Sequence, residues 1–185
     1  MLLGAAKHLA ETRNFEGTVY FCFQPAEEGG AGAQIMLQEG MLDRYPARAV
    51  YGMHNWPGVP AGTFAVRPGP VMAASDEFVI TIRGQGGHAA QPQTTSDPLI
   101  AGAHLVTALQ TIVSRKVDPL KSAVVSVTEF HAGSACNIIA DEARISGTTR
   151  SYEPEVQDII NTELQRLSAN IAAGMGVKVS LSHES

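Results

Sequence analysis

Cysteine is scarce in this chain, and its scarcity argues against a disulfide-rich, secreted protein. Only Cys22 and Cys136 occur among the 185 residues. Neither belongs to a Cys-x-x-Cys pair of the kind that holds zinc. A small secreted domain held by disulfides would carry cysteine at a much higher density. We therefore expect two free thiols in a reducing compartment, and a cytoplasmic location.

Long apolar runs and clusters of basic residues are also missing. No stretch approaches the roughly 18 consecutive apolar residues that suggest a membrane span. Residues 1–8 lack the basic n-region of a signal peptide. Lys and Arg are scattered, and the formal net charge is −5. Because binding to nucleic-acid phosphates needs a basic face, we expect neither a nucleic-acid partner nor a membrane partner.

The composition is that of a globular protein, with 44% hydrophobic and 17% charged residues. In the first part of the chain, helical and strand patterns alternate, which predicts a parallel α/β sheet covered by helices. The predicted elements there are a helix at 1–12, a strand at 17–23, a helix at 29–40, a strand at 48–54 and an extended piece at 62–66.

The pattern changes after the proline- and glycine-rich cluster at 67–70. The order becomes β-α-β-β-α-β, which is the ferredoxin-like arrangement. We therefore predict part of an α/β domain at 1–74 and an α+β domain at 75–185. The elements predicted in the second domain are a strand at 76–83, a helix at 98–115, strands at 121–130 and 143–150, a helix at 153–173 and a strand at 176–183.

Both ends of the chain have the pattern of an interior segment. The first helix begins without a capping residue, and the last strand pattern runs to the final residues. We expect a fragment of a longer protein.

Two adjacent carboxylates, Glu27 and Glu28, follow the first predicted strand, after the break at Gln24 and Pro25. In open α/β sheets, ligands bind beyond the carboxyl ends of the strands. Neighbouring carboxylates repel each other unless a cation or a shared proton holds them. The pair suggests a metal site in which one acid is a ligand and the other a base. The alternative is the first turn of a solvated helix, where acids interact favourably with the helix dipole.

His54 ends the second predicted strand, before Pro57. If the two strands are parallel neighbours, His54 lies near the two carboxylates. Imidazole with carboxylate is a suitable ligand set for zinc, manganese, cobalt or nickel. The alternative is an ordinary capping or core histidine.

Five motifs occur in a fixed order, and together they resemble the hippurate hydrolase and N-acyl-amino-acid amidohydrolase family, relatives of zinc aminoacylases and of indole-acetyl-amino-acid hydrolases. That resemblance implies part of a three-layer αβα metallohydrolase domain followed by a lid and dimerisation domain. It also implies two divalent metal ions and hydrolysis of N-acyl amino acids such as hippurate to a carboxylic acid and an amino acid. The motifs are Gln-Pro-Ala-Glu-Glu-Gly from 24, Gly-Met-His-Asn-Trp-Pro-Gly from 52, Gly-Gln-Gly-Gly-His-Ala-Ala-Gln-Pro from 84, Asn-Ile-Ile-Ala-Asp from 137 and Gly-Thr-Thr-Arg from 147.

Roles in the catalytic half follow from this resemblance. Glu27 matches the general base, which takes a proton from a metal-bridging water and later gives it to the leaving amine. Glu28 and His54 match metal ligands.

Roles in the second half follow in the same way. His88 matches a histidine that reaches into the partner subunit's site of a homodimer and stabilises the oxyanion. The glycines around it are expected to supply backbone conformations that other residues avoid. Asn137 matches a polar contact to the substrate, and Arg150 matches the residue that binds the substrate's carboxylate.

The chain also departs from the family pattern. A Cys-Gly-His-Asp motif that supplies further ligands upstream of the first helix is absent, and so is a later histidine ligand. The fragment itself is therefore expected to be inactive. Two other readings stay open: a non-catalytic module for dimerisation or substrate binding, and a dipeptidase or carboxypeptidase of the same clan.

Overall fold

The computed structural model describes residues 1–27 and 30–184. The chain divides into two units, Met1–Ala61 and Gly62–Ser185, so the division falls before the predicted boundary at 74 and 75. Among the described residues, no helix is both long enough and apolar enough to cross a lipid bilayer.

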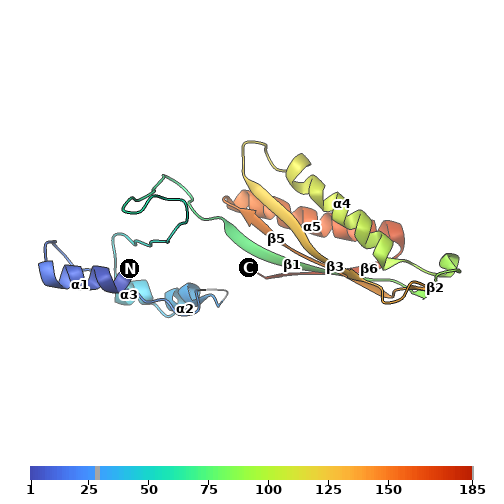
Figure 1. Ribbon diagram of the computed structural model, residues 1–185, viewed down its shortest axis with the longest axis horizontal. Coiled ribbons are helices and arrows are strands. Elements are labelled where there is room, and N and C mark those ends of the chain that lie inside the picture. Colours follow the sequence, from blue (N-terminus) through green and yellow to red (C-terminus); the bar gives the residue numbers. More distant parts are fainter. Residues whose placement is uncertain (28–29, 185) are drawn as a thin grey trace. The chain divides into compact units, whose positions relative to one another are not determined.

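The described residues of the first unit form three helices (Figure 1). The helix predicted at 1–12 is confirmed as α1 (Leu2–Thr12). In place of one helix at 29–40, the structure has α2 (Gly32–Gln38) and α3 (Met41–Arg44). Gly40, with φ of 80°, separates them, because a left-handed residue ends an α-helix and glycine adopts that conformation without a steric cost.

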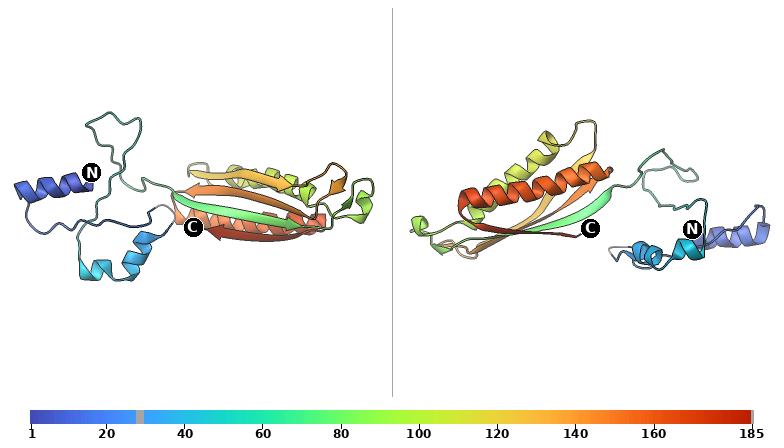
Figure 2. Two further views of the ribbon diagram at one scale, coloured as in Figure 1. Left: turned by 60° about the horizontal axis from the view of Figure 1, so that its bottom comes forward. Right: turned by 180° about the vertical axis from the view of Figure 1, so that it is seen from behind.

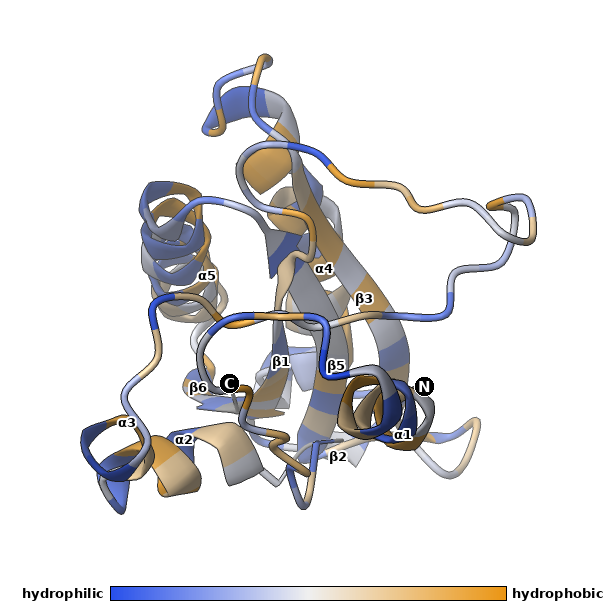
Figure 3. Ribbon diagram, turned by 90° about the vertical axis from the view of Figure 1, so that its left-hand side faces the viewer, coloured by the Kyte–Doolittle hydropathy of each residue, from blue (hydrophilic) through white to orange (hydrophobic). Residues whose placement is uncertain are grey.

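The strands predicted in this unit are wrong. Residues 17–23 and 48–54 form no strand, and the described part of the first unit therefore contains no parallel sheet. A strand is stable only when neighbouring strands take up its backbone hydrogen bonds, and neither segment pairs with the other. The apolar side chains remain in solvent: Val50 is 80% exposed and Tyr51 is 91% exposed. Figure 3 shows hydrophobic residues along α1 and α2 as well, and none of the residues of α1 is buried.

The second unit follows the predicted order of elements closely. Four long strands form one antiparallel sheet in the order β3-β5-β1-β6. Two long helices cover one face of this sheet, and the other face is open (Figures 1 and 2). The mixed α/β class is thus confirmed, with antiparallel strands. The elements are β1 (Ala74–Arg83), α4 (Pro98–Arg115), β3 (Ala123–Ala132), β5 (Glu142–Ser151), α5 (Pro154–Met175) and β6 (Lys178–Glu184).

Buried and less buried side chains alternate along the strands, and the buried ones lie on the sheet face that the helices cover. Phe78, Ile80 and Ile82 of β1 are at most 1% exposed, while the residues between them are less buried. They pack with Ile145 of β5 in one core under α4 and α5. Each side chain of this size contributes roughly 1.5–3 kcal/mol when fully buried. The helix residues of the core are Ala101, Leu105, Leu109, Ile112, Val156, Ile160, Leu164 and Ala172.

The start of α4 follows from local sequence. The Asp97 carboxylate accepts hydrogen bonds from the backbone N–H groups of Leu99 and Ile100, at 2.8 and 3.2 Å. Pro98 occupies the first turn, where its missing N–H costs nothing. This N-cap fixes the end of α4 that lies next to the shorter elements at one end of the sheet.

Those shorter elements are a 3-10 turn, η1 (Pro92–Thr94), and a two-stranded ribbon of β2 (Gly87–His88) and β4 (Ile138–Ile139). We call residues 84–92 and 137–141 the tip. In the ribbon, Gly87 pairs with Ile139 and His88 with Ile138. The tip lies at the end of β1 and the start of β5, at the opposite end of the sheet from Ala74 and Ser151 (Figure 1).

Gly147, in the middle of β5, provides a test of this packing. A Cβ at this position would overlap the Ser126 carbonyl oxygen and lie 2.5 Å from Cζ of Phe78. Gly147→Ala is therefore expected to lower the free energy of unfolding of the second unit by about 1–3 kcal/mol. Urea unfolding followed by far-ultraviolet circular dichroism measures it.

Gly174→Ala is the matched control, because a Cβ at Gly174 in α5 would meet nothing within 4 Å. That substitution is expected to raise stability by about 0.5–1 kcal/mol, since alanine favours a helix interior over glycine. Equal effects of the two substitutions would contradict the packing of β5 against Phe78.

Candidate functional site

Glu27 lies in a turn after Ala26, whose φ is 48°. Its side chain is exposed. Glu28, the second predicted carboxylate, lies outside the described residues. The structure therefore places one carboxylate of the predicted pair on an open turn, where a base would be accessible to water.

His54 lies in an exposed, irregular segment. The strand that was expected to carry it to a sheet edge is absent. Within 1–27 and 30–184, no group of three or more His, Cys, Asp or Glu side chains could hold a metal ion. The residues described do not fit a metal centre by themselves, so we derive no chemical step from one.

His88 and Asn137 are brought together at the tip. The backbone N–H of Ala89 donates to the Asn137 carbonyl oxygen at 3.0 Å, next to the pairing of His88 with Ile138. Both His88 and Asn137 are exposed. Two of the residues predicted to contact substrate, from motifs far apart in the sequence, therefore share one short ribbon.

The orientation of the His88 ring is fixed by a local hydrogen bond. Its Nδ1 accepts from the backbone N–H of Ala90 at 3.1 Å. An imidazole whose Nδ1 is an acceptor carries its proton on Nε2. His88 therefore presents an Nε2–H donor, which is the group required to stabilise a negatively charged oxygen.

The glycines of the tip allow neighbouring backbone segments to approach each other closely, and they do not adopt unusual dihedral angles. Gly84 and Gly86 do not have the positive φ that the sequence suggests. A Cβ on Gly84 would overlap the Ser96 carbonyl oxygen, and a Cβ on Gly86 would overlap that of Ile139. The glycines let β2 and its neighbours pack at backbone distance.

Asp141 is a residue of the tip to which the sequence assigns no role. Its carboxylate accepts the N–H of Gly86 at 2.7 Å, and its carbonyl accepts the N–H of Gly84 at 2.9 Å. Asp141 thus ties the loop before His88 to the strand after Asn137. Its place at the end of the Asn137 motif is the only sequence signal for this role.

Arg150 lies near the other end of β5, on the open face of the sheet. Its Nη1 donates to the Thr149 carbonyl oxygen at 2.7 Å and to the hydroxyl of Thr148. Thr148 in turn donates to the backbone carbonyl of Asp76 at 3.0 Å. The half-buried guanidinium is thereby held against the sheet, with further donors left for a carboxylate.

The sheet separates Arg150 from His88. Glu142, beside the tip, and Arg150 are about eight residues apart on β5, which is about 27 Å at about 3.4 Å per residue. A small N-acyl amino acid cannot span that distance. Within one copy of this unit, a substrate molecule that contacts His88 and Asn137 therefore cannot also contact Arg150.

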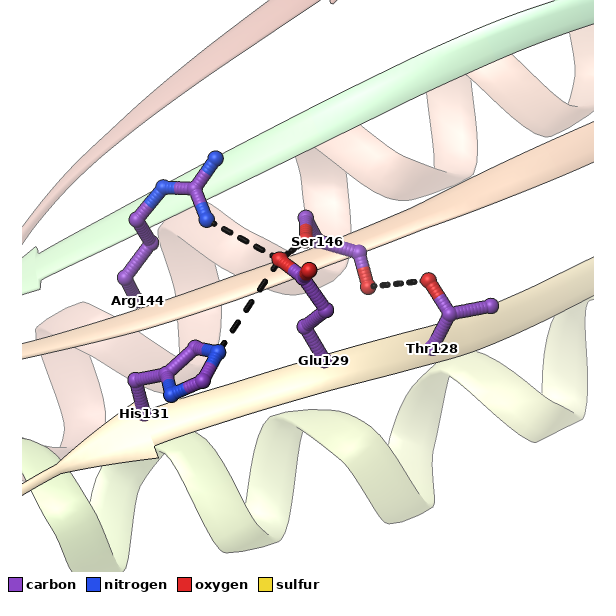
Figure 4. Close-up of polar contacts among 5 residues, drawn as sticks. All are labelled: Thr128, Glu129, His131, Arg144 and Ser146. Carbon is purple, nitrogen blue, oxygen red and sulfur yellow. Dashed lines mark hydrogen bonds and ion pairs between the residues drawn. The ribbon is translucent and has the colours of Figure 1, made fainter.

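A second polar cluster lies between these ends on the open face (Figure 4). The Glu129 carboxylate accepts hydrogen bonds from the Ser146 hydroxyl at 2.6 Å and from Nη1 of Arg144 at 3.1 Å. Nε2 of His131 is 4.0 Å away. The bulge between Val127 and Glu129 aims Glu129 and His131 toward this cluster. The Ser146 hydrogen bond, followed by the Arg144 guanidinium, lowers the pKa of Glu129.

A groove of about 570 Å³ opens at the tip. We call it the tip groove. Asp97 is the one charged residue among the described residues that line it, and its carboxylate is used to cap α4. Its lining includes Ala89, which follows His88, and Cys136, which precedes Asn137. Cys136 and Cys22 are both free thiols, and both are exposed.

Comparison with known proteins agrees with the order of motifs. A family model described as peptidase family M20/M25/M40 matches residues 1–183. The chain is 42% identical over 178 residues to an N-acetylcysteine deacetylase of Bacillus subtilis (strain 168), covering 96% of this chain and 46% of that protein. It is 39% identical over 180 residues to a hippurate hydrolase of Campylobacter jejuni, covering 97% and 47%.

A solved structure is similar as well. The YXEP protein of Bacillus subtilis, described as a dinuclear metal-binding peptidase of the M20 family, superposes with a TM-score of 0.76 at 35% identity. The match covers 99% of this chain and 45% of that one. The chain thus spans about half the length of the curated relatives it matches.

The Glu129 cluster yields a prediction about pH. Replacing Ser146 by alanine removes the shortest hydrogen bond to the carboxylate, so the pKa of Glu129 should rise toward its ordinary value of 4.5. A carboxyl whose pKa is lowered by folding stabilises the fold above its unfolded pKa. That contribution disappears as pH falls through the folded pKa. A carbon-13 NMR titration of the Glu129 carboxyl measures the change.

Thr128→Ala is the control for this titration. Thr128 donates to the Ser146 backbone carbonyl at 3.5 Å, so its loss leaves the Ser146 hydroxyl in place. The pKa of Glu129 should then stay low. An unchanged pKa in Ser146→Ala would contradict the leading role of the Ser146 hydroxyl and assign the shift to Arg144 and His131.

Proposed function

The chain belongs to peptidase family M20/M25/M40, and from this membership we propose that it is part of a hydrolase that cleaves the amide bond of N-acyl amino acids such as hippurate. One observation carries the proposal beyond family membership: the tip holds an exposed Nε2–H of His88 beside Asn137. That arrangement suits stabilisation of an oxyanion formed from an acyl carbonyl. The second unit, with its ferredoxin-like order, would be the lid of this hydrolase.

The residues divide the reaction between them. Glu27 would take a proton from the attacking water as its oxygen bonds to the acyl carbon. His88 would donate a hydrogen bond to the oxygen that becomes negative, with Asn137 as a further polar contact. As the C–N bond breaks, Glu27 would return the proton to the amine. Arg150 would bind the free carboxylate of the amino-acid half. The products are a carboxylic acid and an amino acid.

The separation of about 27 Å along β5 supports a homodimer. If His88 and Arg150 both act on substrate, each must serve a different active site, so the tip of one copy would complete the partner's site. We propose β3 as the edge that pairs between copies. It is a terminal strand of the sheet and longer than the other terminal strand, β6. It exposes Val124 and Phe130, and unpaired edges favour strand pairing.

Metal binding is proposed only for a chain of the relatives' full length. Glu28 and His54 would each supply one ligand to a pair of divalent ions, of zinc, manganese, cobalt or nickel. The remaining ligands would come from sequence outside these 185 residues, because the described residues do not assemble a site. We propose the cytoplasm as its location, in keeping with the two free thiols.

The alternative is that this chain alone is a non-catalytic module for dimerisation or substrate binding. The contrast between the two units favours it: the second unit has a complete buried core, while α1 and α3 of the first bury no residue. Metal content separates the readings. Two ions retained per full-length chain after gel filtration would support an enzyme, and none would support the module.

Glu27→Gln tests the role of the base. In a chain of full length that contains these residues, turnover of hippurate should fall by at least about 100-fold, because glutamine cannot accept the proton. Metal content should be unchanged, since Glu27 is not a proposed ligand. Glu16→Gln, at another exposed carboxylate of the first unit, is the control. Turnover near that of the unmodified enzyme would rule out Glu27 as base.

Mixing two inactive variants tests the shared site. Homodimers of the full-length chain that carry Glu27→Gln or His88→Gln should each be inactive, because each lacks one catalytic group in both sites. If His88 acts on the partner's site, unfolding and refolding the two together should restore about a quarter of the unmodified activity through mixed dimers. If His88 acts within its own chain, no mixed dimer contains an intact site and no activity returns.

A further inference from the structure

The tip groove lies where a substrate's acyl group would be expected, given the role proposed for His88. Its lining includes Ala89, adjacent to His88, together with Cys136 and Ile138, which flank Asn137. The group attached to the acyl carbonyl lies one bond from the carbon whose oxygen His88 would contact. That group must therefore lie within a few ångströms of the tip.

The chemistry of the lining selects the kind of group that fits. The walls are mostly alanine, glycine and aliphatic side chains, with Ser134 and Cys136 as small polar members. The Asp97 carboxylate is already engaged by the N–H groups of Leu99 and Ile100. A volume of about 570 Å³ falls within the roughly 300–1,000 Å³ of small-molecule sites, which are largely apolar with a few polar groups.

The other end of the substrate is excluded from this groove. Among the described residues, the lining has no cation to pair with a carboxylate, and Arg150 lies about 27 Å away along β5. An acetyl group would leave most of the groove filled with water, whereas an aromatic or longer aliphatic acyl group would displace water from the aliphatic side chains of its lining.

We propose that the tip groove is the acyl-binding site, and that it selects N-acyl amino acids with aromatic or extended aliphatic acyl groups over N-acetyl amino acids. This assignment rests on the proposed function, because the position of His88 defines which part of the substrate meets the tip. Ala132, Ala135 and Ile138 are then specificity-determining residues, supplied by one copy to the site of its partner.

Two glycine conjugates that differ only in their acyl group test the assignment. Hippurate carries a benzoyl group and N-acetylglycine an acetyl group, while the amide and the carboxylate are identical. Each is titrated into the nitrogen-15-labelled 185-residue chain, and amide shifts are followed by NMR. Hippurate should shift the amides of Ala89, Ala135 and Ile138, with a Kd at least about tenfold lower than that of N-acetylglycine.

Matched variants locate the binding. Ala135→Trp places a bulky ring in the groove from an exposed position and should abolish the shifts caused by hippurate. Ala169→Trp, at an exposed position on α5, should leave them unchanged. Amides of β1 and β5 with unaltered shifts show that each variant is folded.

Three results would overturn the proposal: no shift of groove amides with hippurate, equal affinity for both conjugates, or hippurate shifts that survive in Ala135→Trp. The titration requires no metal and no turnover, so it is separable from the test of catalysis. If the groove amides do not shift but the full-length enzyme is active, only the assignment of the groove as the acyl-binding site is refuted. Groove binding with a full-length protein that lacks amidase activity supports the groove and refutes the proposed function.

Discussion

The pairing of backbone hydrogen bonds between strands is the constraint on which this structure depends. β1 and β5 pair along ten residues each, and each also pairs with a second strand, so both central strands are satisfied on both sides. The first unit holds equally apolar, strand-like segments at 17–23 and 48–54, but no neighbour takes up their hydrogen bonds. Hydrophobicity alone does not make a strand, because a lone strand leaves polar backbone groups to water and both faces exposed.

The same sheet sets the geometry of function. Once β5 is rigid, the distance between the tip and Arg150 is fixed by the number of residues between them, and no side chain is long enough to bridge it. A substrate contacted by both ends must therefore lie between two copies. Exposed β3 provides an edge that could bring the copies together. Catalysis, on the function proposed, then depends on assembly for a geometric reason, independent of any single contact.

Local signals made the second unit largely predictable. Asp97 and Pro98 define the start of α4, and alternation of apolar residues gave every long strand within a few residues of its observed ends. Non-local features were not predictable. The bulge before Glu129, the hydrogen bonds of Asp141 to a loop distant in sequence, and the close contact at Gly147 all depend on which residues become neighbours in the sheet. His88, Asn137 and Arg150 were predicted from their motifs, and the distance between them followed only from the register of β5.

The two ends of the sheet differ in chemistry as well as in position. Arg150 is held by Thr148 and by a backbone carbonyl, so its charge is fixed in one place and can recognise a carboxylate of any amino acid. The tip presents the donor of His88 beside a groove whose one charged residue among those described, Asp97, caps α4. Binding of the amino-acid carboxylate and discrimination among acyl groups would then be carried out by different copies of the chain. The glycines at 84 and 86 allow the close backbone packing that holds the tip. On the proposed assignment, substitutions at the groove alanines would change acyl preference and leave this packing in place.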